Sequence, residues 1–211
     1  MKLNTSLAAA ITLALLSTSA HALKQGDMFT KVGAINVSPN DSSTDFSGAA
    51  TVGASVKSDT QISLTLNYML QDNIGIELLL ATPFTHDIYA TGGGAALGKV
   101  ADTKQLPPTV SVQYYFSPQA KLRPYAGVGI NFTNFFDINV TDASGTLTSL
   151  DLDDSWGLAA QVGVDYDMGN DWFINFDIRY INIETTGTSN LGTISADINP
   201  TIVTLAAGFN F

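Results

Sequence analysis

Three short stretches of this sequence hold residue types that act in binding or catalysis. Residues 93–99 have the glycine and lysine spacing of a phosphate-binding loop, but Val100 follows where the Mg²⁺-binding serine or threonine belongs. The aspartates of 151–154 offer oxygens that suit Ca²⁺, yet the glycine and terminal glutamate of an EF-hand loop do not follow. His86 stands beside Asp87, but no serine nucleophile can be placed against them. We interpret the three stretches as a flexible loop, a solvated acidic loop and a histidine at a loop base, and we predict no enzyme, cofactor or metal site.

Charged residues inside otherwise apolar segments are more informative. Five of them occupy alternating positions: Lys31, Glu77, Asp165, Asp177 and Arg179. A charge that faces lipid costs free energy, so all five are expected to face an enclosed interior. We expect Lys31, Glu77, Asp165 and Asp177 to form a polar network near one end of that interior, with Arg179 near mid-height. Opposite charges enclosed in this way should pair.

The segments that carry these charges alternate apolar and polar side chains with period two, which is typical of β-strands with one apolar face. In 60–70, for example, Ile62, Leu64 and Leu66 alternate with polar residues. Eight such strands are predicted, at 27–37, 60–70, 74–84, 106–116, 123–136, 156–166, 172–183 and 200–211. Short turns alternate with long loops between them, and the long loops are 38–59, 85–105, 137–155 and 184–199.

This pattern predicts an all-β fold, an eight-stranded antiparallel transmembrane β-barrel. The sequence is 45% hydrophobic with a mean hydropathy of +0.17, yet after residue 22 no apolar run is long enough for a spanning helix. A soluble barrel such as a lipocalin would enclose its apolar face, whereas here the charges are enclosed. Outward aromatic residues also gather at the strand ends as two interfacial girdles. These are Tyr68, Tyr114, Phe116, Tyr166, Trp172 and Phe211 on the turn side, and Phe84, Phe132, Trp156 and Tyr180 on the loop side.

The two ends of the sequence indicate the outer membrane of a Gram-negative cell. Residues 1–22 combine a positive charge, a short apolar core and a small-x-small ending, which predicts a signal peptide cleaved after Ala22. Residues 23–211 then form the barrel. The segment 200–211 ends on Phe211, and we expect it to close the barrel and to engage the barrel-assembly machinery.

Composition restricts the partners further. The formal net charge is −10, which argues against nucleic acid because phosphate binding needs a basic surface. The sequence contains no cysteine, so a disulfide framework and a thiolate metal site are excluded. Outer-membrane lipid and small hydrophobic solutes are the expected partners.

Inward residues near the loop side are apolar and predict a channel. The expected lining residues are Ile35, Val37, Leu79, Ala81, Phe135, Arg179, Ile181, Ile183 and Ile202. Because the polar network would block the other half, a solute would need a side exit into lipid. Proline cannot donate to a strand ladder, so Pro83, Pro107 and Pro108 mark the expected lateral opening. The alternative is that both halves are packed and the prolines only end the strands.

Several runs of residues resemble the outer membrane protein W (OmpW) family. They are Asp-Asn-Ile-Gly-Ile-Glu-Leu-Leu at 72–79, Ala-Thr-Pro-Phe at 81–84, Leu-Pro-Pro-Thr at 106–109, Arg-Pro-Tyr-Ala-Gly-Val-Gly-Ile-Asn at 123–131 and Asp-Ser-Trp-Gly at 154–157. The resemblance implies an eight-stranded outer-membrane barrel with a narrow apolar channel. It also implies passage of small hydrophobic molecules from outside into the membrane, and some members serve as bacteriocin receptors. Arg179 departs from the apolar or aromatic residue expected there.

Three functions remain open from the sequence. Passive uptake of small hydrophobic molecules is favoured by the apolar inward residues. A structural or receptor barrel, which would bind a bacteriocin or phage through its extracellular loops, is the alternative that a fully packed interior would favour. A membrane enzyme would need a convergent nucleophile and base, and the sequence does not provide them.

Overall fold

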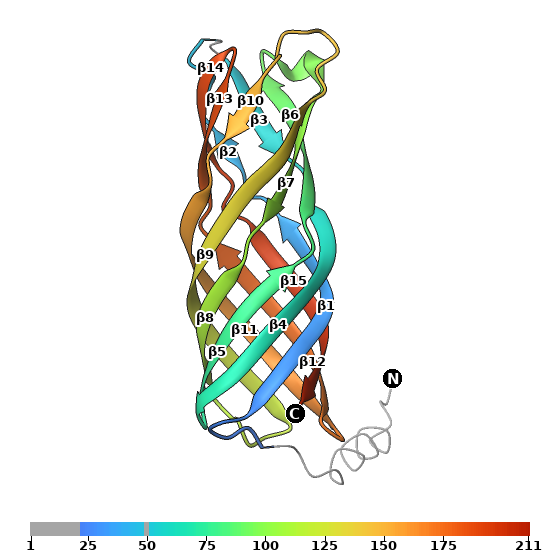
Figure 1. The fold of residues 1–211 in the computed structure, drawn as a ribbon, viewed down its shortest axis with the longest axis vertical. Helices are drawn as coiled ribbons and strands as arrows, with labels where there is room; N and C mark the ends of the chain where they lie inside the picture. The colour runs from blue at the N-terminus through green and yellow to red at the C-terminus, as the bar shows by residue number, and fades with distance from the viewer. Residues whose placement is uncertain (1–21, 49–50) are drawn as a thin grey trace, which may run out of the picture.

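The computed structural model describes residues 22–48 and 51–211, and most of these residues lie in β-strands (Figure 1). The predicted signal peptide, residues 1–22, lies outside the described residues except for Ala22. Within the described part of the chain, no helix is long and apolar enough to cross a membrane.

Eight strands form a closed antiparallel barrel, which confirms the predicted fold class. Around the ring they are β1 (Met28–Ser38), β4 (Asp59–Gln71), β5 (Ile74–Ala81), β8 (Thr109–Tyr115), β9 (Leu122–Val140), β11 (Ser155–Gly169), β12 (Trp172–Ile181) and β15 (Thr201–Asn210). The ring closes because β1 pairs with β15 over its length, which leaves neither strand with a free edge. Figure 1 shows the strands tilted around the barrel axis, with the C-terminus at the lower end.

Above the closed barrel the wall continues as two upper sheets, of which one extends the barrel sheet through β9 and the other is separate. On one side, β7 (Lys99–Leu106) pairs with the upper part of β9, and β6 (Phe84–Gly92) and β3 (Val52–Val56) follow in that order. On the other side, a four-stranded sheet has the order β10 (Leu150–Leu152), β13 (Glu184–Ser189), β14 (Gly192–Asp197) and β2 (Ser42–Ser43). A short 3₁₀ helix, η1 (Ala95–Leu97), connects β6 to β7.

These two sheets correct the sequence prediction, which was wrong to treat the four long connections as loops. Their backbone groups pair with one another in ladders such as β6–β7 and β13–β14. The pairing satisfies the peptide groups above the membrane and lets alternate side chains turn inward. The molecule is therefore a tall barrel whose upper part is made of these two sheets, and no ladder between described residues joins one sheet to the other (Figure 1).

Side chains on the barrel strands alternate between lumen and lipid as predicted. On β1, Phe29 and Lys31 are buried in the lumen, whereas Val32 is 50% exposed on the outer surface. Phe84 is an exception, because it was predicted in the outward girdle and is fully buried. The chain breaks its strand between Ala81 and Phe84, so a new strand begins with the opposite face inward.

Candidate functional site

The turn-side end of the lumen is closed by a cluster of apolar and aromatic side chains. Its buried members are Leu23, Phe29, Met69, Tyr115, Tyr125 and Phe173. Edge-to-face contacts hold it together, with the rings of Phe29 and Phe173 centred 5.7 Å apart. Phe173 also covers Gly208, where any side chain would overlap the ring. We call this cluster the aromatic plug.

A buried charge cluster lies above the aromatic plug, and Glu77 is its centre. Glu77 Oε2 accepts a hydrogen bond from Lys31 Nζ at 3.1 Å, and its Oε1 accepts one from Arg179 Nη2 at 2.6 Å. Arg179 Nε also lies 3.6 Å from Asp177 Oδ1. All four side chains are at most 5% exposed, so this is a group of desolvated charges that depend on one another for compensation.

Neutral side chains extend this cluster across the lumen. The Tyr125 hydroxyl donates to Asp177 Oδ2 at 2.9 Å, and Asn175 Nδ2 donates to Asp165 Oδ1 at 2.8 Å. Lys31 Nζ lies 4.8 Å from the centre of the Tyr125 ring, a cation–π contact. The free space among these groups is about 10 Å³, roughly the room for one water molecule. A solute larger than water therefore has no straight path through this level.

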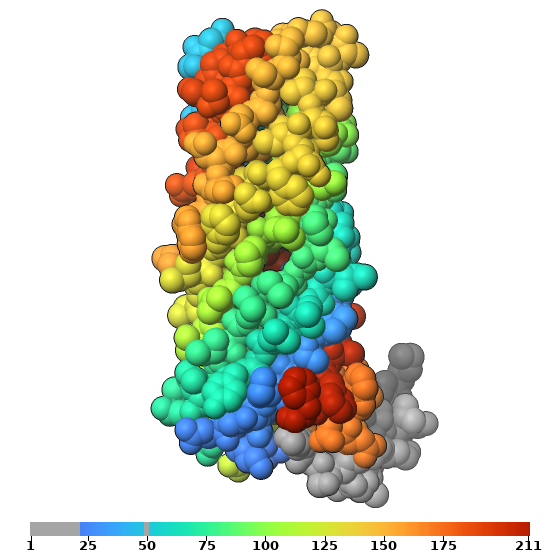
Figure 2. All heavy atoms as spheres, viewed as in Figure 1, coloured from blue at the N-terminus to red at the C-terminus, as the bar shows by residue number. Residues whose placement is uncertain are grey.

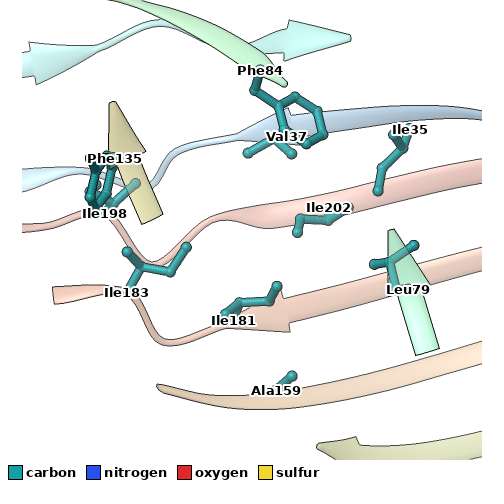
Figure 3. Close-up of a cluster of buried hydrophobic side chains, with 10 residues drawn as sticks. All are labelled: Ile35, Val37, Leu79, Phe84, Phe135, Ala159, Ile181, Ile183, Ile198 and Ile202. Carbon is teal, nitrogen blue, oxygen red and sulfur yellow. The ribbon is translucent and has the colours of Figure 1, made fainter. Parts of the chain in front are cut away.

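An apolar layer lies directly above the charges, because Leu79 and Ile181 are the next inward residues after Glu77 on β5 and Arg179 on β12. It consists of Ile35, Val37, Leu79, Phe84, Phe135, Ala159, Ile181, Ile183, Ile198 and Ile202, and none of these side chains is more than 8% exposed. They come from β1, β5, β9, β11, β12 and β15 of the ring, from β6, and from the connections on either side of β13 and β14, and Figure 3 labels all of them. The layer separates the charge cluster from the upper part of the molecule.

Above the apolar layer, the two upper sheets enclose a cavity of about 70 Å³, which we call the upper chamber. Its walls come from β3, β6 and β7 on one side and from β10, β13 and β14 on the other, and Leu147 of the β9–β10 connection also contributes. Most lining residues are apolar, among them Phe46, Val52, Ile88, Ala90, Val100, Leu150 and Ile194. Phe135 and Ile198 line the chamber and also belong to the apolar layer, which is therefore the chamber floor.

The barrel wall has a break at the level of the chamber floor. The ladder between β5 and β8 ends at the pair Leu79–Thr109, and the ladder between β6 and β7 begins at Phe84–Gln105. In the described chain, no backbone hydrogen bond joins 80–83 to 107–108 across this interval. Figure 2 shows a small opening at mid-height between green segments, with red atoms of the far wall visible behind it.

Comparison with known proteins decides the family. Residues 24–211 match the model of the OmpW family. The chain is 45% identical over 210 residues to outer membrane protein W of Vibrio cholerae serotype O1, and the alignment covers 96% of each chain. The chain belongs to the OmpW family. The resemblance predicted from the sequence is thus confirmed.

Solved structures agree with this assignment. The crystal structure of the outer membrane protein OprG from Pseudomonas aeruginosa superposes with a TM-score of 0.84 at 36% identity, covering 90% of this chain and 98% of that one. The solid-state NMR structure of outer membrane protein AlkL in lipid bilayers gives 0.69 at 29% identity, covering 91% and 93%. This OmpW-family protein is therefore an outer-membrane barrel of a Gram-negative cell, and outer-membrane lipid surrounds it.

The residues predicted as the lumen polar network all lie in the charge cluster of this OmpW barrel. Lys31, Glu77 and Asp177 are linked through the contacts of Glu77 and Arg179. Asp165 is fully buried and reaches the others through Asn175 and Tyr125. The barrel fold therefore brings charges that are far apart in the sequence into one buried group.

The residues predicted to line a channel fall at three places. Seven belong to the apolar layer, namely Ile35, Val37, Leu79, Phe135, Ile181, Ile183 and Ile202. Ala81 packs against that layer, and Arg179 belongs to the charge cluster below it. Of the whole predicted set, Phe135 alone also borders the upper chamber.

Most chamber walls were therefore missed by the sequence prediction, because they lie in segments that were taken for loops. A signal was present in 84–92, where inward Phe84, His86, Ile88 and Ala90 alternate with outward residues. His86 was predicted at a loop base, but it is a buried residue in the middle of a strand pair. In the acidic stretch, Asp154 accepts hydrogen bonds from the Asn134 side chain and the Phe135 amide.

Other candidate chemistry takes ordinary structural roles in the described residues. Residues 93–99 lie at the β6–β7 connection and include η1. Among the described residues, no group of three or more histidine, aspartate or glutamate side chains is arranged to hold a metal ion. Pro83, Pro107 and Pro108 lie at the break in the wall, where Asn131 Nδ2 donates to the carbonyl oxygens of both Pro107 and Pro108.

Proposed function

We propose that this protein is a channel for the passive uptake of small hydrophobic molecules across the outer leaflet of the outer membrane. The observation that supports this most strongly is the upper chamber, an apolar cavity of about 70 Å³ at the outer end of a barrel whose lower half is filled by the aromatic plug and the charge cluster. Apolar surface leaves water at a gain of about 25 cal/mol per Å², so the chamber attracts apolar solutes without any energy source.

The exit in this proposal is lateral, at Pro83, Pro107 and Pro108. A solute that passed downward would have to enter the charge cluster, where it would disrupt the ion pairs of Glu77 without replacing them. The break in the wall lies at the height of the apolar layer, and no ladder of backbone hydrogen bonds has to be broken there for a solute to pass. Small rearrangements of the layer would then connect the chamber with lipid, and the solute would remain in apolar surroundings throughout.

A receptor or structural role is the second candidate, and the tight packing of the apolar layer supports it. In that case the extended outer sheets would bind a bacteriocin or a phage, and the chamber would be the core that holds those sheets together. The two functions make different predictions for a variant in which a larger side chain fills the chamber.

Replacing Ala90 with tryptophan should reduce uptake at least severalfold. Ala90 is buried in the chamber wall, so the indole would occupy the space that a solute needs. The measurement is the uptake of a radiolabelled single-ring hydrocarbon by cells that express the protein, compared with cells that do not. Thr91→Trp, on the outward face of the same strand, is the matched control and should transport normally. Normal uptake by a folded Ala90→Trp variant would favour the receptor role.

Deleting Phe211 should lower the yield of folded barrel in the outer membrane. Phe211 is 67% exposed at the turn-side end, beside Phe209, so it contributes little to the core and remains accessible to assembly machinery. Its amide also donates to Met28 O across the closing seam. The measurement is the fraction of heat-modifiable protein on unboiled gels. An unchanged fraction would contradict a role for Phe211 in assembly.

A further inference from the structure

The otherwise apolar upper chamber has polar side chains at a few places, three on the β6–β7 wall and one on β13. Four polar side chains line it, namely His86, Thr103, Gln105 and Thr185. The hydroxyls of Thr103 and Thr185 are committed to backbone carbonyl oxygens, with Thr185 Oγ1 donating to Asp153 O at 2.7 Å. His86 and Gln105 remain, and they contact each other on the neighbouring strands β6 and β7.

The two nitrogens of His86 have separate roles. Nδ1 lies 2.6 Å from Lys57 O, a carbonyl oxygen that can only accept, so Nδ1 carries the proton. In a neutral ring Nε2 is then an acceptor, and Gln105 Nε2 donates to it at 2.9 Å. Burial lowers the pKa of His86, although the Lys57 carbonyl and the charges of Asp59 and Asp87 oppose this effect.

In this arrangement both ring nitrogens of His86 have a hydrogen-bond partner, whereas the Gln105 amide keeps part of its hydrogen-bonding capacity. One N–H of the Gln105 amide is bonded to His86, and the other N–H and the carbonyl Oε1 form no hydrogen bond within the described chain. Because His86 Nε2 accepts, the NH₂ end of the Gln105 amide must face it, and the position of Gln105 Oε1 is therefore defined. A buried amide that can still both donate and accept favours a ligand that completes its hydrogen bonds.

We propose that Gln105, oriented by His86, is the recognition point for a single hydroxyl group on an otherwise apolar solute. A hydroxyl both donates and accepts, so it matches Oε1 and the remaining N–H of Gln105 together. This inference rests on the proposed uptake function and adds the substrate class, which is small phenols and alcohols in preference to hydrocarbons of the same shape.

The chamber has a suitable size for such a molecule. About 10–15 Å³ of cavity volume holds one water-sized group, so the chamber of 70 Å³ holds about five to seven of them. This is the size of a single aromatic ring with one substituent. The apolar ring would contact side chains such as Ile88 and Val100, and its hydroxyl would reach Gln105 on the wall.

The test compares two probes of nearly equal shape, 4-fluorophenol and 4-fluorotoluene, bound to the full barrel in phospholipid nanodiscs. Binding is followed by ¹⁹F NMR titration, with empty nanodiscs as the blank for partition into lipid. The wild-type protein should bind the phenol more tightly than the toluene. Gln105→Leu should weaken phenol binding by roughly three- to tenfold, the usual value of one hydrogen bond, and should leave toluene binding unchanged.

Two further measurements make the result specific. Thr103→Val removes a chamber hydroxyl that is already committed to the backbone, so its phenol-to-toluene ratio should equal that of the wild type. The side-chain amide signal of Gln105 in the wild type should shift with the phenol and not with the toluene, which needs no variant. Equal discrimination between phenol and toluene by the wild type and Gln105→Leu, or an unmoved amide signal, would overturn the inference. The proposed uptake through the apolar chamber would not be affected by that result. Failure of both probes to bind would overturn the proposed uptake as well.

Discussion

Replacing Glu77 with alanine is expected to destabilise the barrel by about 3–5 kcal/mol, the usual cost of removing one partner from a buried ion pair. Glu77 is 1% exposed and is the shared acceptor of Lys31 and Arg179, at 3.1 and 2.6 Å. Without its carboxylate, two positive charges would remain in a lumen with room for about one water molecule. The measurement is the urea midpoint of the protein refolded in lipid vesicles.

The chain offers a matched control for this variant. Glu184 is an exposed glutamate at the start of β13, where it accepts a hydrogen bond from Asn182. Glu184→Ala should change the stability by no more than about 0.5 kcal/mol, as surface substitutions usually do. A double variant, Glu77→Leu with Arg179→Met, should recover part of the loss because it removes opposite charges together. An unchanged midpoint for Glu77→Ala would mean that the cluster does not depend on Glu77.

Linking the two edges of the wall break is expected to reduce uptake to the level of cells without the protein. Leu80 and Pro108 occupy the register positions just above the last β5–β8 pair, Leu79–Thr109. Leu80→Cys with Pro108→Cys, joined by a short reducible cross-linker, would hold the edges together and prevent the lateral step. Uptake of a radiolabelled single-ring hydrocarbon should return when the same protein is reduced, so each sample is its own reference.

A second staple tests whether the site matters or only the cross-link. Val128 and Ala160 are paired between β9 and β11, both on the lipid-facing surface where the ladder is intact. Val128→Cys with Ala160→Cys should transport equally well in the linked and reduced states. Full uptake through a completely linked Leu80–Pro108 protein would exclude this exit, and the solute would need another path.

The sequence alone was sufficient to predict the barrel fold. Alternation with period two, charges such as Lys31 and Glu77 at inward positions, and aromatic residues such as Trp156 and Trp172 at the strand ends all depend on local chemistry against lipid or lumen. A closed barrel is the one sheet that satisfies its backbone in a bilayer, so eight strands of this kind had a single solution. Short motifs then identified the OmpW family.

The tertiary structure decided what lies inside the barrel. The sequence placed Ile35, Ile181 and Ile202 near the outer end, but it did not reveal that they meet in a packed layer, because packing depends on side chains from separate strands. It also missed the upper chamber and the contact between His86 and Gln105. Ladders that continue above the membrane are not enforced by lipid, so their weaker alternation resembles that of loops, and only long-range pairing made those segments into walls.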